Sequence, residues 1–382
     1  MIKKIKWFIN GSIRHLRQLF IPIKNIIVFE SIPDFSDNTK AVFDEMVRRR
    51  LNEKYHLVWQ TVRPAKGFPK IENVTYLNIK DPLQQKCAFR HLTEAKCIIS
   101  CNRFLPSQRK KQFSFYLSHG TTIKSVRSYY TIPKKIDRCL IASEGVTKIQ
   151  SYELNFPAEK MVPLGFPRND VLNQPPIDIR TPLQTNCKTI IVWYPTFRQH
   201  KGGSKTASSC TLPVLENEEA AIALNAAAKA NDILLVLKPH FAQDVSYVKD
   251  LHLSNIRFID DQFFADHHIF SYAFVAACDA MITDYSSIYF DYTLCDKPIA
   301  VVWEDLEEYL RSPGLIQNYE YYLKGAEKVY TEKELEEFIV RVSQEIDLLK
   351  EDRREIRDLA NISTDGKNAE RVVDYIIEKA NL

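Results

Sequence analysis

The sequence predicts an α/β protein built from two doubly wound parallel sheets, each in its own domain. The 382 residues are 45% hydrophobic and 26% charged, which is the composition of a soluble protein and the length of two domains. Short apolar runs alternate with helical stretches, and a Pro-rich polar stretch at residues 173–186 interrupts them near the middle. Apolar strands separated by helices are typical of parallel sheets that are covered on both faces.

The first domain is expected to occupy residues 25–175. It opens with the run NIIVFES at residues 25–31, which predicts a buried strand because it is apolar almost throughout. The stretch at residues 39–51 predicts a helix. Further strands are expected at residues 56–62, 74–79, 97–101, 114–118, 138–142 and 161–164.

The second domain is expected at residues 186–350, where the alternation resumes after the linker. C-terminal helices are expected at residues 351–382, the last of them over 365–382. Ligands of doubly wound sheets bind at the carboxyl ends of the strands, so residues that follow a strand are the candidates for function. The expected strands are 189–194, 233–238, 256–259, 280–283 and 299–303, and the expected helices are 216–230, 287–295 and 332–349.

The basic excess of the chain lies at its N-terminus. The net charge is +4, whereas the first 25 residues carry six basic residues and no acidic one, which leaves −2 for the remainder. This distribution argues against a broad nucleic-acid-binding face, and no nucleic-acid partner is expected. On a helix over residues 2–20, the apolar side chains form one narrow stripe, with basic side chains opposite. The stripe consists of Ile2, Ile5, Ile9, Ile13, Leu16 and Phe20, and the basic side chains are Lys3, Lys6, Arg14 and Arg17.

Residues 1–24 are therefore interpreted as a basic amphipathic helix, with residues 1–20 lying on an anionic membrane surface. The alternative is an amphipathic helix packed on the body of the protein itself. The N-terminus lacks the continuous apolar core of a signal peptide. No apolar run approaches the roughly 20 residues that span a bilayer.

Metal and dinucleotide motifs are missing from the sequence. The eight cysteines form no CxxC pair and are interpreted as reduced thiols of a cytosolic protein. His267 and His268 have no partners at metal-ligand spacing, and no DxD-type pair follows a strand, so no metal is expected. No GxGxxG occurs, so no dinucleotide is expected and the cofactor prediction is none.

Two polar groups stand out after strands of the first domain. His119 and Gly120 follow an apolar strand, and a histidine pKa near 6.5 suits proton transfer at neutral pH. The alternative for His119 is a loop histidine with a structural hydrogen bond. Near the end of the domain, the preference of Gly, Pro and Asn for turns explains three residues of GFPRND. It does not explain Arg168 and Asp170, which could form an internal salt bridge or a pair of residues in the cleft.

Cations and hydroxyls follow the strands of the second domain. Arg198 is a candidate phosphate clamp, with a salt bridge to a helix as the alternative. Lys238 and His240 follow the next strand. The densest piece is TDYSS, in which a strand ends and a Ser pair opens a helix whose N-terminus would bind phosphate. Plain helix capping by Asp284 or Ser286 is the alternative there.

These motifs, in this order, resemble those of the CDP-glycerol:glycerophosphate glycerophosphotransferase family, whose members build wall teichoic acids and some capsule polymers. The TDYSS and PRND elements are the specific ones. Departures from the family pattern are Thr122, Phe197, Pro239 and Phe241. The matching residues are Glu30, Ser31, Asp37, Asn38, Lys40, Asn102, His119, Gly120, Thr121, Lys124, Gly165, Pro167, Arg168, Asn169, Asp170, Pro195, Thr196, Arg198, Lys238, His240, Thr283, Asp284, Tyr285, Ser286, Ser287, Asp291, Lys297, Pro298, Asp305, Tyr309 and Gly314.

The resemblance implies a GT-B fold, in which two Rossmann-like domains face a cleft. The N-terminal domain would take the acceptor and the C-terminal domain CDP-glycerol. It also implies a peripheral enzyme at the cytoplasmic face of the cell membrane that transfers glycerol phosphate to a hydroxyl of a lipid-linked saccharide acceptor and releases CMP. The absence of room for a large extra acceptor domain favours a primase-like role. The alternatives are a CDP-ribitol donor, a GT-B sugar-nucleotide glycosyltransferase and a non-catalytic scaffold.

The resemblance also assigns hypothetical roles. His119 is the expected general base on the acceptor hydroxyl, and His240 the group that stabilises the pyrophosphate or protonates departing CMP. The substrate-binding set would hold and neutralise the phosphates, with Asp284 orienting its loop and Arg168 and Asp170 shaping the cleft. That set is Gly120, Arg168, Asp170, Arg198, Lys238, Thr283, Asp284, Ser286 and Ser287.

Overall fold

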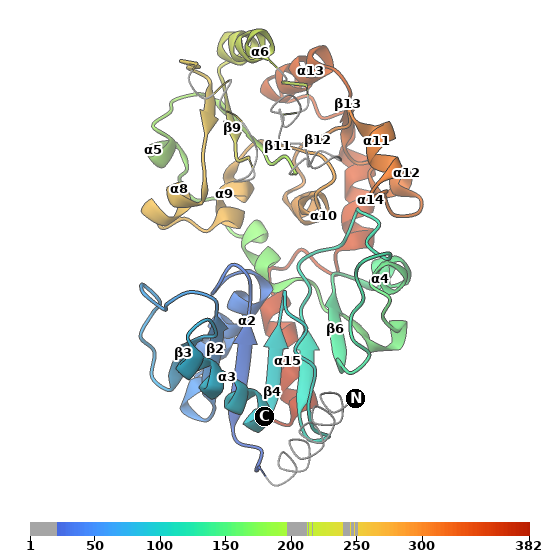
Figure 1. The fold of residues 1–382 in the computed structure, drawn as a ribbon. Helices are drawn as coiled ribbons and strands as arrows, with labels where there is room; N and C mark the ends of the chain where they lie inside the picture. The colour runs from blue at the N-terminus through green and yellow to red at the C-terminus, as the bar shows by residue number, and fades with distance from the viewer. Residues whose placement is uncertain are drawn as a thin grey trace, which may run out of the picture.

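The computed structural model describes residues 21–196, 212, 214–215, 217–239, 245, 248 and 251–382, and the membrane helix predicted for residues 1–20 lies outside that part of the chain. Two domains are stacked end to end, each around one parallel sheet (Figure 1). The predicted α/β fold with GT-B architecture is confirmed. Both sheets share the doubly wound strand order, in which the first strand is central and the chain winds outward in both directions.

The first sheet has seven strands in the order β3-β2-β1-β4-β5-β6-β7, all paired in parallel. Its strands are apolar because both faces are covered: in β1, Ile27 and Phe29 face one core while Ile26 and Val28 face the other. The strands are β1 (Ile26–Glu30), β2 (His56–Thr61), β3 (Val74–Asn78), β4 (Cys97–Ser100), β5 (Phe113–Tyr116), β6 (Arg138–Ile141) and β7 (Met161–Pro163).

The second sheet has six strands in the order β10-β9-β8-β11-β12-β13. Its central strand β8 is buried along its whole length. The edge strand β13, with sequence EKV, was not predicted because two of its three residues are charged and only half-buried. The strands are β8 (Thr189–Trp193), β9 (Ile233–Leu237), β10 (Ile256–Phe258), β11 (Ala280–Thr283), β12 (Ile299–Val302) and β13 (Glu327–Val329).

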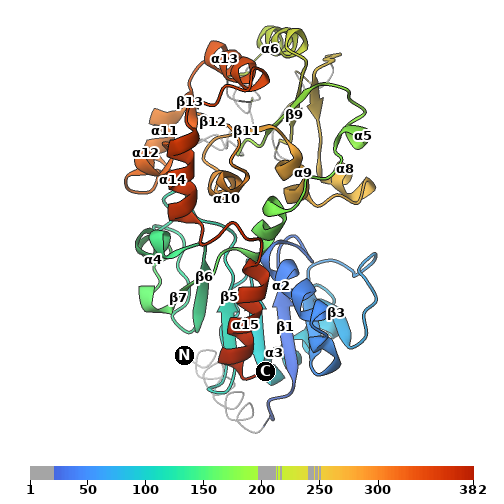
Figure 2. The same ribbon diagram turned by 180° about the vertical axis from the view of Figure 1, so that it is seen from behind.

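The last helix returns to the first domain. α15 (Asn368–Ala380) lies beside α2 (Asp37–Arg48) on the first sheet, where Val372, Val373 and Ile376 complete the core (Figure 2). The opposite face carries α3 (Pro82–Glu94). The remaining α-helices are α4 (Thr147–Glu153), α5 (Arg180–Leu183), α6 (Glu218–Ala230), α8 (Asp261–Asp266), α9 (Ser271–Ala277), α10 (Ile288–Tyr292), α11 (Leu306–Arg311), α12 (Tyr319–Tyr322), α13 (Glu332–Ser343) and α14 (Lys350–Ala360).

Three predicted elements differ from the structure. The helix expected at 332–349 ends at Ser343, because Glu345 adopts a left-handed backbone conformation with φ of 61° that breaks it from α14. The helix expected at 287–295 is α10 followed by a 3₁₀ turn at Thr293–Cys295. The linker expected at 173–186 contains the short helix α5.

The domains meet through backbone pairing as well as through side chains. Residues 123–125 of the first domain pair antiparallel with residues 314–316 of the second, and the N–H of Ser125 donates to the Gly314 carbonyl oxygen at 3.0 Å. Further along, the Ser143 hydroxyl donates to the carbonyl of Leu359 in α14 at 2.6 Å. These contacts fix how the strand ends of the two sheets face each other.

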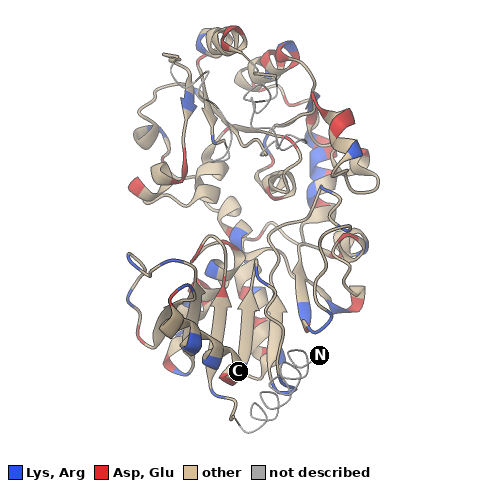
Figure 3. Ribbon diagram, viewed as in Figure 1, with Lys and Arg blue, Asp and Glu red and all other residues tan. Residues whose placement is uncertain are grey.

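Lys and Arg residues are interspersed with Asp and Glu residues along the ribbon of both domains, in the part of the chain that the structure describes (Figure 3). Within the described ranges, no helix has the length and apolarity that crossing a membrane requires. Those same ranges contain no group of three His, Cys, Asp or Glu residues placed to hold a metal ion.

Candidate functional site

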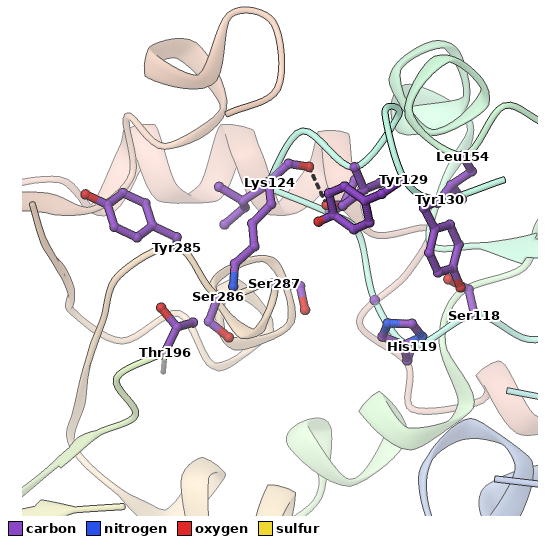
Figure 4. Close-up of a pocket in the computed structure, with 14 residues that line it drawn as sticks. Ser118, His119, Lys124, Tyr129, Tyr130, Leu154, Thr196, Tyr285, Ser286 and Ser287 are labelled. Atoms are coloured by element: carbon purple, nitrogen blue, oxygen red, sulfur yellow. Dashed lines mark hydrogen bonds between the residues drawn. The ribbon is translucent and has the colours of Figure 1, made fainter. Parts of the chain in front are cut away.

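A cavity of about 360 Å³ lies where the carboxyl ends of the two sheets face each other (Figure 4). It forms beside the point where the strand order of the second sheet reverses, between β8 and β11, which is where doubly wound sheets bind ligands. Both domains contribute side chains, so the cavity exists only when they are apposed. The lining residues are Ser118, His119, Gly120, Thr122, Ile123, Lys124, Val126, Tyr129, Tyr130, Leu154, Thr196, Tyr285, Ser286 and Ser287.

His119 lies on the first-domain side, in the loop that follows β5. Its imidazole faces the cavity, and Tyr130 packs edge-on against it with the ring centroids 6.5 Å apart. The side chain keeps an exposed surface within the cleft. Burial by the surrounding protein lowers the pKa of His119 below its ordinary value of 6.5, while the nearby Asp37 carboxylate acts to raise that pKa. The imidazole is therefore neutral at pH 7, as a general base must be.

Gly120 faces Ser287 of the second domain at close range. Its φ is +133°, and a Cβ atom there would lie 2.7 Å from the Ser287 hydroxyl and 3.0 Å from a guanidinium nitrogen of Arg168. The first distance is shorter than real Cβ contacts show and the second is tight, so a side chain here would force its neighbours to shift, and the positive φ favours glycine as well. The loop thereby brings His119 up to the second domain.

Ser286 and Ser287 lie opposite His119, between β11 and α10. Ser287 is the N-cap residue of α10, but its side chain makes no capping bond. The Ser286 hydroxyl accepts only a long bond, 3.5 Å from the N–H of Ile288. Helix capping therefore does not account for the pair, and the hydroxyls face the cavity.

Asp284 holds the neighbouring strand end in place. Its buried carboxylate accepts bonds from the backbone N–H and the hydroxyl of Thr196, each at 2.9 Å, and from the N–H of Tyr285. The bonds tie the end of β8 to the end of β11. This geometry matches the predicted orienting role, and Asp284 itself does not line the cavity.

Thr283 and Asp170 need correction as substrate-binding candidates. Thr283 is fully buried, and its hydroxyl donates to the Tyr194 carbonyl at 2.9 Å, so it joins two strands. Asp170 accepts the N–H groups of Asn368 and Ala369, both at 2.8 Å, and so caps the start of α15. Burial raises the pKa of Asp170 from 3.8 to about 6. Neither side chain lines the cavity.

Arg168 joins the domains from beneath the cavity. Its side chain is 7% exposed, and its guanidinium donates to Asp37 of the first domain and to Asp291 of the second, each at 2.8 Å. The sequence left Arg168 and Asp170 as an internal salt bridge or a cleft pair, and the structure shows neither pairing. Arg168 binds Asp37 and Asp291, whereas Asp170 caps α15.

Lys238 lies at the end of β9, where its ammonium group is 3.0 Å from the exposed carboxylate of Asp261. It is outside the lining of the cavity. Arg198 and His240 lie outside the described part of the chain. The structure therefore brings His119, Gly120, Ser286 and Ser287 together and places Lys238 outside the cavity lining, while Arg198 and His240 stay untested.

Tyr130 is a site residue that sequence reasoning missed. It lies in the irregular loop between β5 and β6, where no periodic pattern marks which side chains turn inward. Its hydroxyl hydrogen-bonds that of the buried Tyr116, which fixes its ring beside His119. Lys124, Thr196 and Tyr285 also line the cavity, and only the family resemblance pointed to them.

Comparison with known proteins gives the family. A sequence profile described as CDP-glycerol:poly(glycerophosphate) glycerophosphotransferase matches residues 13–378. The chain belongs to this family. As a member of this family, the protein is a transferase. Of the two specific motifs, TDYSS lies at the cavity and PRND at the junction of the domains.

The relatives of this glycerophosphotransferase-family chain include primases of similar length. A teichoic acid glycerol-phosphate primase of Bacillus spizizenii is 23% identical over 381 residues, which covers 91% of each chain. The corresponding primase of Bacillus subtilis is 24% identical over 313 residues, covering 75% of this chain and 76% of the relative. A teichoic acid ribitol-phosphate primase of Bacillus spizizenii is 26% identical over 401 residues, covering 96% and 94%.

The solved structures support the fold. A structure of the wall teichoic acid polymerase TagF superposes with a TM-score of 0.75 over 98% of each chain, at 19% identity. A UDP-N-acetylglucosamine 2-epimerase of Listeria monocytogenes gives a TM-score of 0.55 at 13% identity, covering 94% of this chain and 97% of that one.

Proposed function

We propose that this transferase moves glycerol phosphate from CDP-glycerol to a hydroxyl of a lipid-linked saccharide and releases CMP, in the synthesis of a teichoic acid or a capsule-type polymer. One observation carries the proposal: His119 of the first domain faces Ser286 and Ser287 of the second across a single cavity. This arrangement supports a role for His119 as general base and for the two hydroxyls as phosphate-binding donors.

The reaction needs positioning more than covalent chemistry by the protein. In the proposal His119 accepts the proton of the acceptor hydroxyl while its oxygen attacks the phosphorus that bears glycerol. The bond from that phosphorus to the bridging oxygen breaks, and CMP departs with the electron pair and is protonated by His240. Ser286 and Ser287 hold the phosphoryl oxygens, and Arg198 neutralises them.

The relatives support this choice of substrates. Two of them are named glycerol-phosphate primases, and one TagF structure was obtained with CDPG. The chain covers 91% of one glycerol-phosphate primase, 75% of a poly(glycerol phosphate) polymerase and 57% of a poly(ribitol-phosphate) polymerase. CDP-ribitol is the second candidate donor, because the ribitol-phosphate primase is 26% identical over 94% of its own length.

Turnover of both donors tests the proposal. The enzyme is incubated with CDP-glycerol or CDP-ribitol and a lipid-linked disaccharide, and the products are weighed by mass spectrometry. His119→Ala and His240→Ala should each lose about 10²–10⁴-fold in rate, whereas the exposed His252→Ala serves as the matched control. If both active-site variants keep more than about a tenth of the activity, the proposed acid–base roles are wrong.

We also propose that the enzyme works peripherally at the cytoplasmic face of the cell membrane, held there by the basic apolar pattern of residues 1–20. A lipid-linked acceptor remains in its membrane, so an enzyme held at that surface meets it by diffusion in two dimensions.

A further inference from the structure

The backbone on both sides of His119 has an unusual conformation. Ser118 is not a glycine, yet its φ is +54°, in the left-handed region that residues with a side chain rarely adopt. On the other side, Gly120 has a φ of +133°. A residue other than glycine keeps a left-handed backbone only where its surroundings impose it. The groups that hold Ser118 therefore determine where the chain presents His119.

The carbonyl oxygen of Ser118 is held by two buried donors. It accepts the side-chain amide of Asn38 at 3.0 Å and the thiol of Cys101 at 2.7 Å. Both donors are fully buried, and the Asn38 amide also reaches the Leu117 carbonyl at 3.4 Å. Turning the carbonyl away would leave both buried donors without a partner, which is costly. The peptide between Ser118 and His119 is therefore fixed in one orientation.

Each donor is itself held in place by other parts of the first domain. Asn38 lies in the first turn of α2, and its Oδ1 accepts the backbone N–H of Arg168 at 3.2 Å, in the turn that carries the PRND motif. Cys101 directly follows β4, and its N–H donates to the Glu30 carbonyl of the neighbouring strand β1 at 3.1 Å. The Ser118 carbonyl is thus connected to α2, to the sheet and to the domain junction.

Cys101 also contacts the imidazole of His119 through its backbone. Burial lowers the pKa of His119, and Asp37 acts to raise that pKa. Arg168 acts to lower the same pKa, and a hydrogen bond with the Cys101 backbone acts to raise it. A hydrogen bond that favours the protonated imidazole is one in which the ring N–H donates, so the Cys101 carbonyl is the acceptor. Such a bond determines which ring nitrogen carries the proton and leaves the other to accept one.

We infer that Asn38 and Cys101 are positioning residues for His119, and that they orient its imidazole toward the facing domain by holding the Ser118 carbonyl. Neither side chain lines the cavity, so both act through the loop and not on a substrate. The inference rests on the proposed function, because it concerns the placement of the proposed general base. A displacement of about 1 Å can cost a reacting group roughly 100-fold in rate, so loss of either bond should be measurable.

Steady-state kinetics of two Cys101 variants test the inference. Cys101→Ala removes one donor and should lower kcat about tenfold while the KM for CDP-glycerol stays within about twofold, because Ser286 and Ser287 are untouched. Cys101→Ser keeps a hydroxyl donor and should restore kcat to within about threefold of the wild type. Cys97→Ala is the matched control, since this equally buried thiol lies in the same strand at the end away from the loop.

Asn38→Ala removes the second donor, with Thr39→Val as its control. Thr39 is the next residue of α2, is equally buried and donates its hydroxyl to the Glu30 carbonyl at 3.0 Å. Thr39→Val therefore also loses a buried hydrogen bond, but not one to Ser118. Asn38→Ala should lower kcat at least about tenfold and Thr39→Val less than about threefold. Urea unfolding measures the stability of all variants, and equal losses of kcat in each variant and its control would overturn the inference.

Nuclear magnetic resonance titration of the histidine imidazoles tests the placement of His119 without turnover, with His119→Ala to assign its signal. Because burial is the largest influence on this pKa, it should move toward 6.5 in Asn38→Ala and Cys101→Ala and stay unchanged in both controls. If the wild type transfers neither donor but the pKa moves in these variants, the proposed function is wrong and the positioning role stands. If the wild type is active and both variants keep its kcat and its pKa, the positioning role is wrong. Cys101→Ala removes a single donor, so it still decides the matter should Asn38→Ala fail to fold.

Discussion

The guanidinium Nη2 of Arg168 lies 2.8 Å from Oδ2 of Asp291, and this buried ion pair joins the first domain to the second. Oδ2 of Asp291 also accepts the hydroxyl of Tyr272, and Oδ1 accepts the amide of Asn169, each at 2.8 Å. The other end of the guanidinium is bound to Asp37. One carboxylate of α10 thus fixes three side chains, and two of them, Arg168 and Asn169, belong to the PRND motif.

Removing Asp291 should therefore destabilise the protein strongly. Asp291→Ala leaves a buried guanidinium with one partner fewer, and breaking such a pair costs about 3–5 kcal/mol. Urea unfolding measures the free energy of unfolding for the variant and the wild type. Glu345→Ala, which breaks the exposed pair with Lys188, is the control and should cost less than about 1 kcal/mol. Equal losses in the two variants would refute a structural role for the buried pair.

Gly120→Ala should reduce both stability and activity. The new methyl group would overlap the Ser287 hydroxyl at 2.7 Å, so the His119 loop must withdraw from the second domain. We expect a loss of at least tenfold in kcat/KM for the donor, because small displacements of a reacting group are costly. Gly67→Ala is the matched control, since its φ is +87° but nothing lies within 4 Å of the added atom. It should cost only the backbone strain of about 1 kcal/mol.

The loss of activity at low pH should follow the protonation of His119. Burial lowers its pKa, so the neutral base persists below pH 6.5, and activity is lost only as the pH falls through the lowered value. Asp37→Asn removes the charge that raises this pKa and should move the loss of activity to still lower pH. Asp44→Asn, on the exposed side of the same helix, is the control. His119 would be excluded as the base if activity were already lost above pH 6.5. It would also be excluded if Asp37→Asn did not change the pH at which activity is lost.

Asp170 should make the fold less stable as the pH rises between about 4 and 6. Its pKa is raised from 3.8 to about 6 in the folded protein, so over that interval the folded state binds a proton that the unfolded state has released. Folding stability falls with pH wherever the folded state binds more protons. Asp170→Asn should flatten this part of the profile, as measured by urea unfolding at several pH values. If the free energy of unfolding has the same slope against pH in the wild type and in Asp170→Asn, the pKa of Asp170 is not raised in the folded protein.

Deleting residues 1–20 should release the enzyme from liposomes of anionic lipid and leave CDP-glycerol binding intact. The deletion removes five of the six basic residues near the N-terminus, and each is worth about 1 kcal/mol at an anionic surface. Co-sedimentation and nucleotide-induced thermal stabilisation measure the two properties separately. Loss of both would mean that the segment belongs to the fold, which is the alternative left open by its amphipathic pattern.

The strands were the predictable part of the fold. β1, β8 and β9 are buried along their whole length, so each appears in the sequence as an uninterrupted apolar run. β13 gives no such signal, because it lies at the edge of its sheet with two charged residues. The amphipathic pattern of α15 predicted a helix that covers a sheet. It did not indicate which sheet, since that choice depends on Asp170, 198 residues before Asn368, and on the still more distant core of the first domain.

The candidate site was predicted in part for a similar reason. His119, Ser286 and Ser287 follow strands, and doubly wound topology places strand ends at one edge. Thr283 also stands at a strand end, but its side chain turns inward to bond Tyr194, and the sequence does not distinguish the two orientations. Tyr130 comes from the middle of a loop, where only the three-dimensional path brings it to the cavity.

The return of α15 has a consequence for how the chain folds during synthesis. The core around α2 needs Val372, Val373 and Ile376, so ribosomes must translate almost the whole message before the earlier domain can close over its apolar face. Until then that face is available to chaperones or to aggregation. A premature stop shortly before residue 368 would therefore damage the half of the protein that was made first.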